Sequence, residues 1–304
     1  MLQVKNLTFR YKKQDILSDI SFSAKEGEHL SIIGESGSGK STLLKLLYGT
    51  YDLNEGEIFW KNNAILGPKY NLIIGPEFMK YVAQEFDLMP FISVSENIGA
   101  FLSNFYPEEK QQRIEELLEV VELIDYAKVK VKELSGGQKQ RVALARAIAR
   151  QPEVLLLDEP FSHIDNFKKQ SLRKSLFRYL KEKNITCIVA THDKDDVLSF
   201  SDHMIVLHDT KIMAYNTPQQ LYNHPKNKLI ASFFGEYNTL KDTGIVYANQ
   251  LKVVEHSYLK ATVKRSYYKG SHYLIEGDLG GDNVFFEHFQ KFQEGSIVYL
   301  YIKK

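Results

Sequence analysis

A glycine-rich segment near the N-terminus constrains the fold of this chain more than any other feature. It reads Gly34-Glu35-Ser36-Gly37-Ser38-Gly39-Lys40-Ser41. It matches the pattern G-x-x-x-x-G-K-[ST], whose glycines let consecutive backbone N–H groups converge on phosphate oxygens at a helix N-terminus. An apolar run at residues 29–33 precedes it, and leucines at helical spacing follow in residues 41–48. The sequence therefore predicts a strand, a phosphate-binding loop and a helix in that order.

The side chains that end this loop predict how phosphates and a metal ion are held. Lys40 is expected to neutralise the β- and γ-phosphates, and Ser41 is expected to place its hydroxyl on magnesium. Thr42 is expected to donate to the phosphates. The alternative is a glycine-rich turn with a surface lysine, and the motifs that follow along the chain count against it.

A second glycine-bearing loop lies in the middle of the chain. It reads Leu134-Ser135-Gly136-Gly137-Gln138 and runs into a helical pattern at residues 139–146. Two adjacent glycines have no use in a core segment, and no acid lies near the N-terminus of this helix. Because a helix N-terminus carries partial positive charge, the loop is expected to bind an anion.

A buried strand that ends in two acids follows. Residues 154–157 are apolar, and Asp158 and Glu159 come directly after them. Asp158 is expected to hold magnesium through water, because this ion keeps most of its hydration shell. Glu159 is expected to act as the general base that polarises the water attacking the γ-phosphate. The alternative, two acids facing solvent, fits the strand context poorly.

In this order the motifs resemble the nucleotide-binding subunits of ATP-binding cassette (ABC) transporters, and the resemblance covers residues 1 to about 237. It implies ATP and Mg²⁺ as cofactors and a head-to-tail dimer, either of two copies or with another ABC ATPase. The second glycine loop would then reach the γ-phosphate bound by the other subunit. The residues acting in trans would be Ser135, Gly136, Gly137 and Gln138.

The resemblance also assigns roles to four isolated residues. Gln84 would touch magnesium and the attacking water, and His192 would contact the γ-phosphate and sense its loss. Tyr11 would stack on adenine, and Asp165 would link the two sites of the dimer. Three of them have a plainer interpretation when taken alone: Gln84 as a surface residue, His192 as a structural histidine and Tyr11 as one more strand aromatic.

The chain departs from the family pattern in two places. The family often has a proline shortly before the second glycine loop, where residues 131–133 here are Val-Lys-Glu. His163 and Ile164 replace the usual alanine and leucine before Asp165, which bears on communication between the two sites.

The sequence predicts an α/β fold with two domains. Strand patterns at residues 2–11 and 57–66 indicate a β-rich opening, and residues 86–150 read as a helical insertion. Strands at 154–158 and 185–190 bracket a helix at 169–183, as in a parallel sheet. The nucleotide-binding domain is expected to span residues 1–237 and a small β-domain residues 238–304.

The β-domain is expected to be a small barrel of the oligonucleotide/oligosaccharide-binding (OB) type. Its strand patterns fall at residues 250–254, 259–268, 273–276, 284–287 and 297–302. With the segment at 216–238, it resembles the accessory domain of importer ATPases for sugars, polyamines, iron and oxyanions. The implied partners are integral membrane permease subunits, docked on the loop at 86–98, and indirectly an extracytoplasmic solute-binding protein.

Composition adds exclusions. Lysine and arginine number 39 against 38 aspartates and glutamates, so no broad basic footprint for nucleic acid is expected. No leader and no apolar run of membrane-spanning length is found, which favours the cytoplasmic face of the membrane. The alternative function is a soluble ABC ATPase acting as a mechanical or regulatory switch. The chain has one cassette, no sustained heptads and no basic tail, and these features disfavour that alternative.

Overall fold

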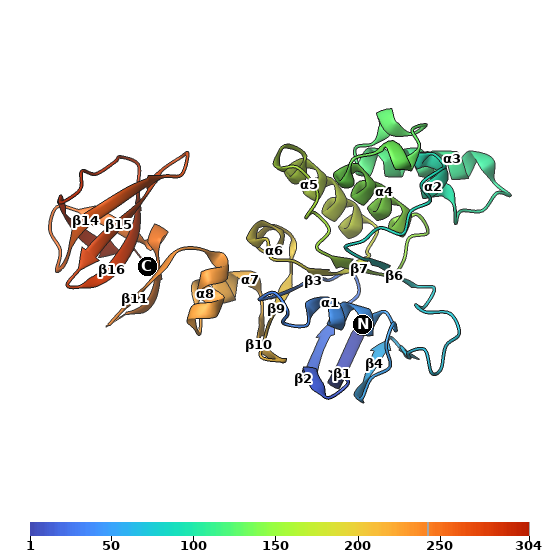
Figure 1. The fold of residues 1–304 in the computed structure, drawn as a ribbon, viewed down its shortest axis with the longest axis horizontal. Coiled ribbons are helices and arrows are strands. Elements are labelled where there is room, and N and C mark those ends of the chain that lie inside the picture. The colour runs from blue at the N-terminus through green and yellow to red at the C-terminus, as the bar shows by residue number, and fades with distance from the viewer. Residues whose placement is uncertain (242, 304) are drawn as a thin grey trace. The chain divides into compact units, whose positions relative to one another are not determined.

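The computed structural model describes residues 1–241 and 243–303, which form two compact units, Met1–Pro218 and Gln219–Lys304 (Figure 1). The division falls before the boundary at residue 237 expected from the sequence, so residues 219–237 pack with the second unit. That the nucleotide-binding domain extends to residue 237 stays a prediction. None of the helices in the described parts of the chain is long and apolar enough to cross a bilayer.

The first unit opens with an antiparallel sheet in the order β2-β1-β4-β5. Its strands are β1 Leu2–Tyr11, β2 Gln14–Ala24, β4 Glu55–Trp60 and β5 Asn63–Ala64. Alternating apolar residues bury one face, as a half-exposed sheet requires. The turn between β4 and β5 is Lys61-Asn62, with Lys61 at φ 54°. The β-rich opening is present as predicted.

A six-stranded sheet in the order β10-β9-β3-β8-β7-β6 forms the centre of this unit. Its strands are β3 His29–Gly34, β6 Met79–Val82, β7 Val154–Asp158, β8 Thr186–Ala190, β9 His203–His208 and β10 Lys211–Asn216. All neighbours are parallel except β10, which runs antiparallel to β9. β7 and β8 are buried at every residue, as strands covered on both faces must be.

Helices cover the two faces of the parallel sheet (Figure 1). α1, Lys40–Leu47, lies between the two sheets, and its four buried leucines share one core with both. The other face carries α2 Val94–Gly99, α3 Pro107–Val120, α4 Gly136–Ile148 and α5 Asn166–Glu182. A further helix, α6 Lys194–Phe200, follows β8. Residues 86–150 contain helices and short turns of helix, which confirms the expected helical segment.

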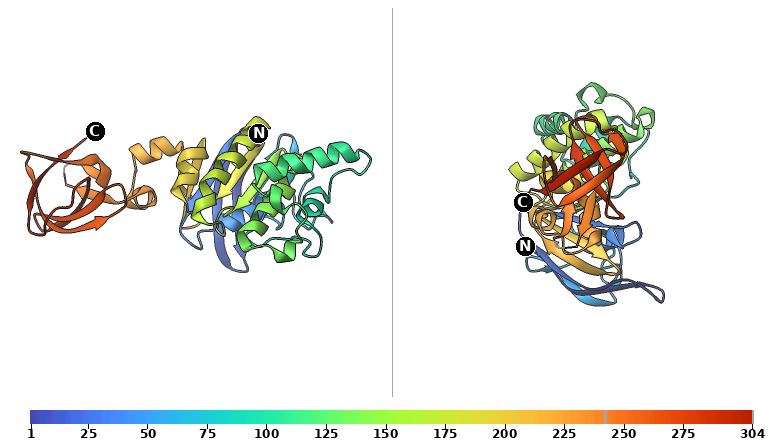
Figure 2. Two further views of the ribbon diagram at one scale, coloured as in Figure 1. Left: turned by 90° about the horizontal axis from the view of Figure 1, so that it is seen from above. Right: turned by 90° about the vertical axis from the view of Figure 1, so that its left-hand side faces the viewer.

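The second unit begins with α7 and α8 and continues as β-structure (Figure 2). α7 is Pro218–Asn223 and α8 is Lys228–Phe234. A hairpin of β11 Tyr237–Leu240 and β12 Gly244–Tyr247 follows, which the sequence patterns did not predict. Five antiparallel strands in the order β13-β17-β14-β15-β16 come next. They are β13 Leu251–Val254, β14 Leu259–Tyr268, β15 Tyr273–Leu279, β16 Asp282–His288 and β17 Ile297–Ile302.

This sheet curls so that β13, at one edge, also lies beside β16 at the other. Its interior is filled by aliphatic side chains and Phe286, with no exposed surface on Leu251, Ile275 or Leu300. The five predicted strands are all present, and β14 and β17 have the expected bounds. The assignment of this unit to the OB class stays a prediction.

Candidate nucleotide-binding site

A cavity of about 530 Å³ in the first unit brings together residues from five separately predicted parts of the sequence. They come from the ends of β1, β3, β6, β7 and β8 and from the start of α1. Ligands in open α/β sheets bind at these carboxyl ends of parallel strands. The lining residues are Tyr11, Ile16, Gly34, Ser36, Gly37, Gly39, Lys40, Ser41, Thr42, Gln84, Glu159 and His192.

The glycine loop shapes one wall of the cavity. Gly37 and Gly39 have φ of 82° and 98°, in the left-handed region that glycine adopts without strain. The Lys40 ammonium donates to the carbonyl oxygens of Gly34 at 2.8 Å and Glu35 at 2.9 Å. Burial lowers the pKa of Lys40, while the charges of Glu159 and Asp158 oppose that fall. The loop thus holds a cation at the N-terminus of α1, where phosphate oxygens bind.

Asp158 and Ser41 supply the oxygen atoms that a magnesium ion requires. Asp158 is 5% exposed, and Ser41 Oγ donates to its Oδ1 at 3.0 Å. A hydroxyl and one carboxylate beside a phosphate site fit Mg²⁺, which binds few protein ligands and keeps water and phosphate oxygens for the rest. The described residues hold no group of three or more acidic, histidine or cysteine side chains suited to a protein-only metal cage.

Glu159 lies in a strained backbone conformation directly after β7. Its φ is 49°, which costs energy for a residue with a side chain. Its N–H donates to the Ala190 carbonyl at 2.9 Å, and its carbonyl accepts from Ser162 Oγ and Gln140 Nε2. The backbone is therefore fixed, and the carboxylate lies 3.2 Å from Nδ1 of His192. Two of the predicted catalytic side chains, Glu159 and His192, are therefore in contact.

The second glycine loop lies outside this cavity. α4 begins at Gly136, and Ser135 caps it by accepting from the Gln138 N–H, while the Gln138 side chain accepts from the Ser135 N–H. No acidic residue lies in the first turn, as predicted. The two glycines differ in their surroundings. A methyl group on Gly136 would meet nothing within 4 Å, whereas one on Gly137 would lie 2.7 Å from the His163 carbonyl oxygen.

The remaining predicted residues occupy varied positions. Tyr11 is 42% exposed at the cavity rim, with its ring edge-on to Phe9 at 4.9 Å. Asp165 caps α5 by accepting from the Lys168 N–H, and it does not line the cavity. Glu35 and Ser38 belong to the glycine loop but are also absent from the lining.

Gln140 is a site residue that sequence reasoning missed. Its side chain is 1% exposed and bridges two functional loops. Nε2 donates to the Glu159 carbonyl at 3.1 Å, and Oε1 accepts from the His163 N–H at 3.1 Å. Its signal was a polar residue on the apolar face of a helix, in register with the buried Leu144 and Ile148.

Arg173 is the centre of a charged cluster that the sequence did not predict, and it includes Asp193, the residue after His192. It is 1% exposed, ion-pairs with Asp193 and Asp196, and lies over the Phe161 ring at 5.5 Å. Burial raises the pKa of Asp196 to about 6, and the Arg173 charge opposes that rise. The cluster ties the segment after Glu159 to the turn that carries His192.

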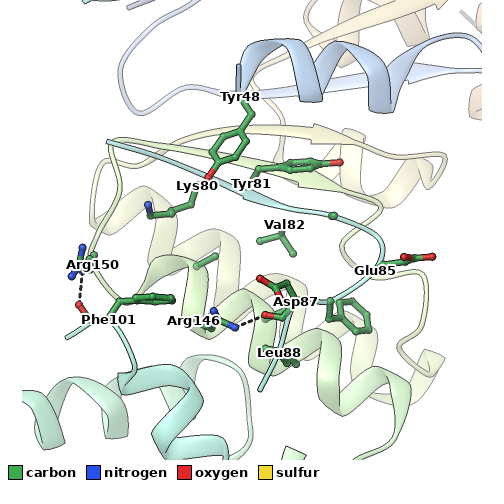
Figure 3. A pocket seen from close by; sticks show the side chains of 14 residues that line it. Tyr48, Lys80, Tyr81, Val82, Glu85, Asp87, Leu88, Phe101, Arg146 and Arg150 are labelled. Atoms are coloured by element: carbon green, nitrogen blue, oxygen red, sulfur yellow. Dashed lines mark hydrogen bonds between the residues drawn. The ribbon is translucent and has the colours of Figure 1, made fainter. Parts of the chain in front are cut away.

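A second cavity, of about 560 Å³, lies between β6, the loop after it and α4 (Figure 3). We call it the β6–α4 groove. The rings of Tyr48 and Tyr81 lie on one wall, and Phe101 lies across from them. Phe101 is 48% exposed, and the guanidinium of Arg146 lies 4.9 Å from its ring centre. The full lining is Tyr48, Lys80, Tyr81, Val82, Ala83, Glu85, Phe86, Asp87, Leu88, Phe101, Ala143, Arg146, Ala147 and Arg150.

Residues 17–162 match the family model described as "ABC transporter". The chain is 40% identical over 238 residues to the Fe(3+) ions import ATP-binding protein FbpC of Haemophilus influenzae strain 86-028NP, covering 78% of this chain and 68% of that one. It is 34% identical over 254 residues to the spermidine/putrescine import ATP-binding protein PotA of Mycoplasma capricolum, covering 83% and 71%.

Solved structures of ATP-binding cassettes are also similar to this chain. The ATP-binding cassette MJ0796, in a dimeric post-hydrolysis state bound to ADP and Pi, is 30% identical with a TM-score of 0.62. The match covers 71% of this chain and 98% of that chain. A dimeric structure described as a bacterial ABC transporter cassette gives a TM-score of 0.63 at 31% identity.

Proposed function

Because this chain belongs to the ATP-binding proteins of ABC transporters, we propose that it is the ATPase subunit of a solute importer and works at the cytoplasmic face of a membrane. The observation that carries the proposal is the single cavity lined by the glycine loop, Gln84, Glu159 and His192. Phosphate-binding, water-orienting and proton-accepting groups meet there, as hydrolysis of a phosphoanhydride requires.

Each group has a distinct part in the reaction. The backbone N–H groups of residues 34–42 and the Lys40 ammonium hold the phosphates, and Tyr11 stacks on adenine. Glu159 accepts the proton of the attacking water, and His192, 3.2 Å away, contacts the γ-phosphate. Ser41, Asp158 and Gln84 would hold Mg²⁺, which would neutralise charge developing on the phosphate oxygens. The fixed backbone of Glu159 places the base before substrate arrives.

The active form is a dimer with shared sites. Ser135 to Gln138 lie outside the cavity, and the space beside the Gly136 Cα is open. Both features suit the approach of this loop to a nucleotide held by another subunit. Mixing a Ser135→Arg chain with a Lys40→Ala chain should restore one intact composite site, because each variant supplies the half that the other lacks. ATPase assays of the mixture should exceed those of either variant alone. Equal activity would rule out sharing in trans.

The β6–α4 groove is the docking site for the membrane permease. The loop at residues 85–88, which follows Gln84, lines this groove, so a bound partner would contact that loop directly. Its lining combines exposed aromatic surface at Phe101 with three cationic residues, Lys80, Arg146 and Arg150, and two acidic ones, Glu85 and Asp87. This chemistry fits an amphipathic segment with apolar and charged side chains.

The second unit is an accessory domain of OB type, and an extracytoplasmic binding protein delivers the solute. Support comes from the importer relatives, one named for Fe(3+) and one for spermidine and putrescine. Iron, polyamines, sugars and oxyanions are the candidate solutes. The alternative is a soluble ABC ATPase that acts as a mechanical or regulatory switch.

The proposal is tested with a tagged Glu159→Gln chain, recovered with ATP from gently solubilised membranes of its host. Loss of the base should cut turnover by about 10²–10⁴-fold while ATP stays bound, which holds the complex together. Mass spectrometry should find a permease and a solute-binding protein. Recovery of soluble partners alone would contradict the importer and support the switch. Near-normal turnover would show that the base is another residue.

A further inference from the structure

Tyr81 belongs to both the β6–α4 groove and the nucleotide-binding site. It lies on β6, beside Leu156 of β7 in the parallel register. Its ring lines the groove next to Tyr48, with ring centres 5.7 Å apart (Figure 3). Its hydroxyl points the other way and donates to Oδ2 of Asp158 at 3.1 Å. One side chain thus connects the groove wall to the carboxylate assigned to magnesium.

The hydroxyl completes the hydrogen bonding of a buried carboxylate. Ser41 Oγ donates to Oδ1 of Asp158, so each carboxylate oxygen accepts from a different hydroxyl. Hydrogen-bond partners of this kind fix the orientation of the carboxylates that hold a metal site.

We propose that Tyr81 is a positioning residue that transmits occupancy of the β6–α4 groove to the magnesium-binding carboxylate of Asp158. A segment docked against the Tyr48 and Tyr81 rings shifts the Tyr81 hydroxyl, and with it the orientation of Oδ2. The assignment of the groove to a permease rests on the proposed function. The link between Tyr81 and Asp158 rests only on the contacts within this chain.

The first test uses full-length Tyr81→Phe, which keeps the ring and removes the hydroxyl. The Mg²⁺ midpoint is read from the unfolding temperature at saturating ADP, with no turnover involved. We expect the midpoint to rise on the order of 10-fold, with ADP affinity in EDTA unchanged. A wild-type midpoint would overturn the proposal. A loss of ADP affinity in EDTA would also overturn it, because the effect would then not be specific to the metal.

The second test perturbs the groove side. Tyr48→Leu should also shift the Mg²⁺ midpoint, and the shift should vanish in the Tyr81→Phe background, because the hydroxyl carries it. Phe101→Leu, on the opposite wall, is the matched control and should leave the midpoint unchanged. Equal shifts from Tyr48→Leu in both backgrounds would show that Tyr81 is not the connection.

Failure of the docking assignment is read separately. Permease recovery with Phe101→Glu in the Glu159→Gln background should fall, because an acid then replaces the aromatic surface of the groove. Unchanged recovery would show that the permease does not dock in the groove. It would also overturn the proposal that permease binding is transmitted to Asp158. The Mg²⁺ titration decides the Tyr81–Asp158 link independently of that outcome.

Discussion

At the scale of single residues, the two glycines of the second loop have different physical reasons for being glycine. Gly137 packs against a backbone oxygen, since a methyl group there would lie 2.7 Å from the His163 carbonyl. Gly136 has open space around that position. Gly137 is therefore required by packing within one chain. The open space at Gly136 would admit a nucleotide held by the other subunit of the proposed dimer.

This difference predicts opposite effects for two matched substitutions. Gly137→Ala should destabilise the nucleotide-free chain by about 1–3 kcal/mol, because the backbone of residue 163 must move. Gly136→Ala should keep or slightly raise stability, since alanine favours helix by up to about 1 kcal/mol, but should weaken ATP-driven dimerisation. Urea unfolding and size-exclusion chromatography with ATP separate the two effects. Equal loss of stability would show that both glycines serve packing.

The functional residues differ in how far the sequence could predict them. The glycine loop, Glu159 and His192 could be placed because local spacing defines a strand end. Gln140 and Tyr81 could not, because their partners lie on other elements and only the folded sheet brings them together. In the sequence alone, Gln140 is a glutamine on the apolar face of a helix and Tyr81 is a tyrosine in a strand. Residues in such positions often have a purely structural role.

At the scale of elements, the burial pattern of each strand explains which parts of the fold could be predicted. β7 and β8 are continuous apolar runs, so their place in a parallel sheet could be inferred. The β11–β12 hairpin was missed because its strands are short and only Asn238 and Val246–Tyr247 are fully buried. Asn238 lies buried there because its amide bonds the backbone of Phe285, a pairing that the sequence does not reveal.

His29, at the start of β3, gives the parallel sheet a pH dependence. It is 1% exposed beside Phe177, and burial lowers its pKa to about 4, with the nearby Lys181 charge adding to this effect. The unfolded chain, with an ordinary histidine pKa of about 6.5, binds the extra proton first as pH falls. This stabilising contribution is therefore present above pH 6.5 and is lost as pH falls towards 4.

We expect the loss from His29 to be about 3 kcal/mol over that range. A His29→Gln variant, which cannot take up the proton, should lose correspondingly less stability between pH 7 and pH 4.5. Urea unfolding at several pH values measures both chains, and the difference at pH 7 serves as the control for altered packing. Parallel pH profiles would show that His29 does not titrate as its burial implies.

At the scale of the whole molecule, the position of the boundary between the two units has a measurable consequence. Residues 219–237 pack with the second unit: the Tyr222 ring stacks on Tyr247 at 4.6 Å and meets Phe234 edge-on at 5.5 Å. The Asn249 side chain also donates to the Tyr222 hydroxyl at 2.9 Å. A chain cut after residue 237 would keep α7 and α8 but lose the strand that covers Tyr222.

We therefore expect the fragment 1–237 to bind more of a hydrophobic dye and to aggregate more readily than the fragment 1–218. Its exposed aromatic surface, at Tyr222 and Phe234, explains the difference. The complementary fragment 219–304 should fold alone, because it holds its own core. Dye fluorescence, light scattering and thermal unfolding compare the three fragments. If the fragment 1–237 binds less dye and aggregates less than the fragment 1–218, α7 and α8 belong functionally with the nucleotide-binding unit, as the sequence first suggested.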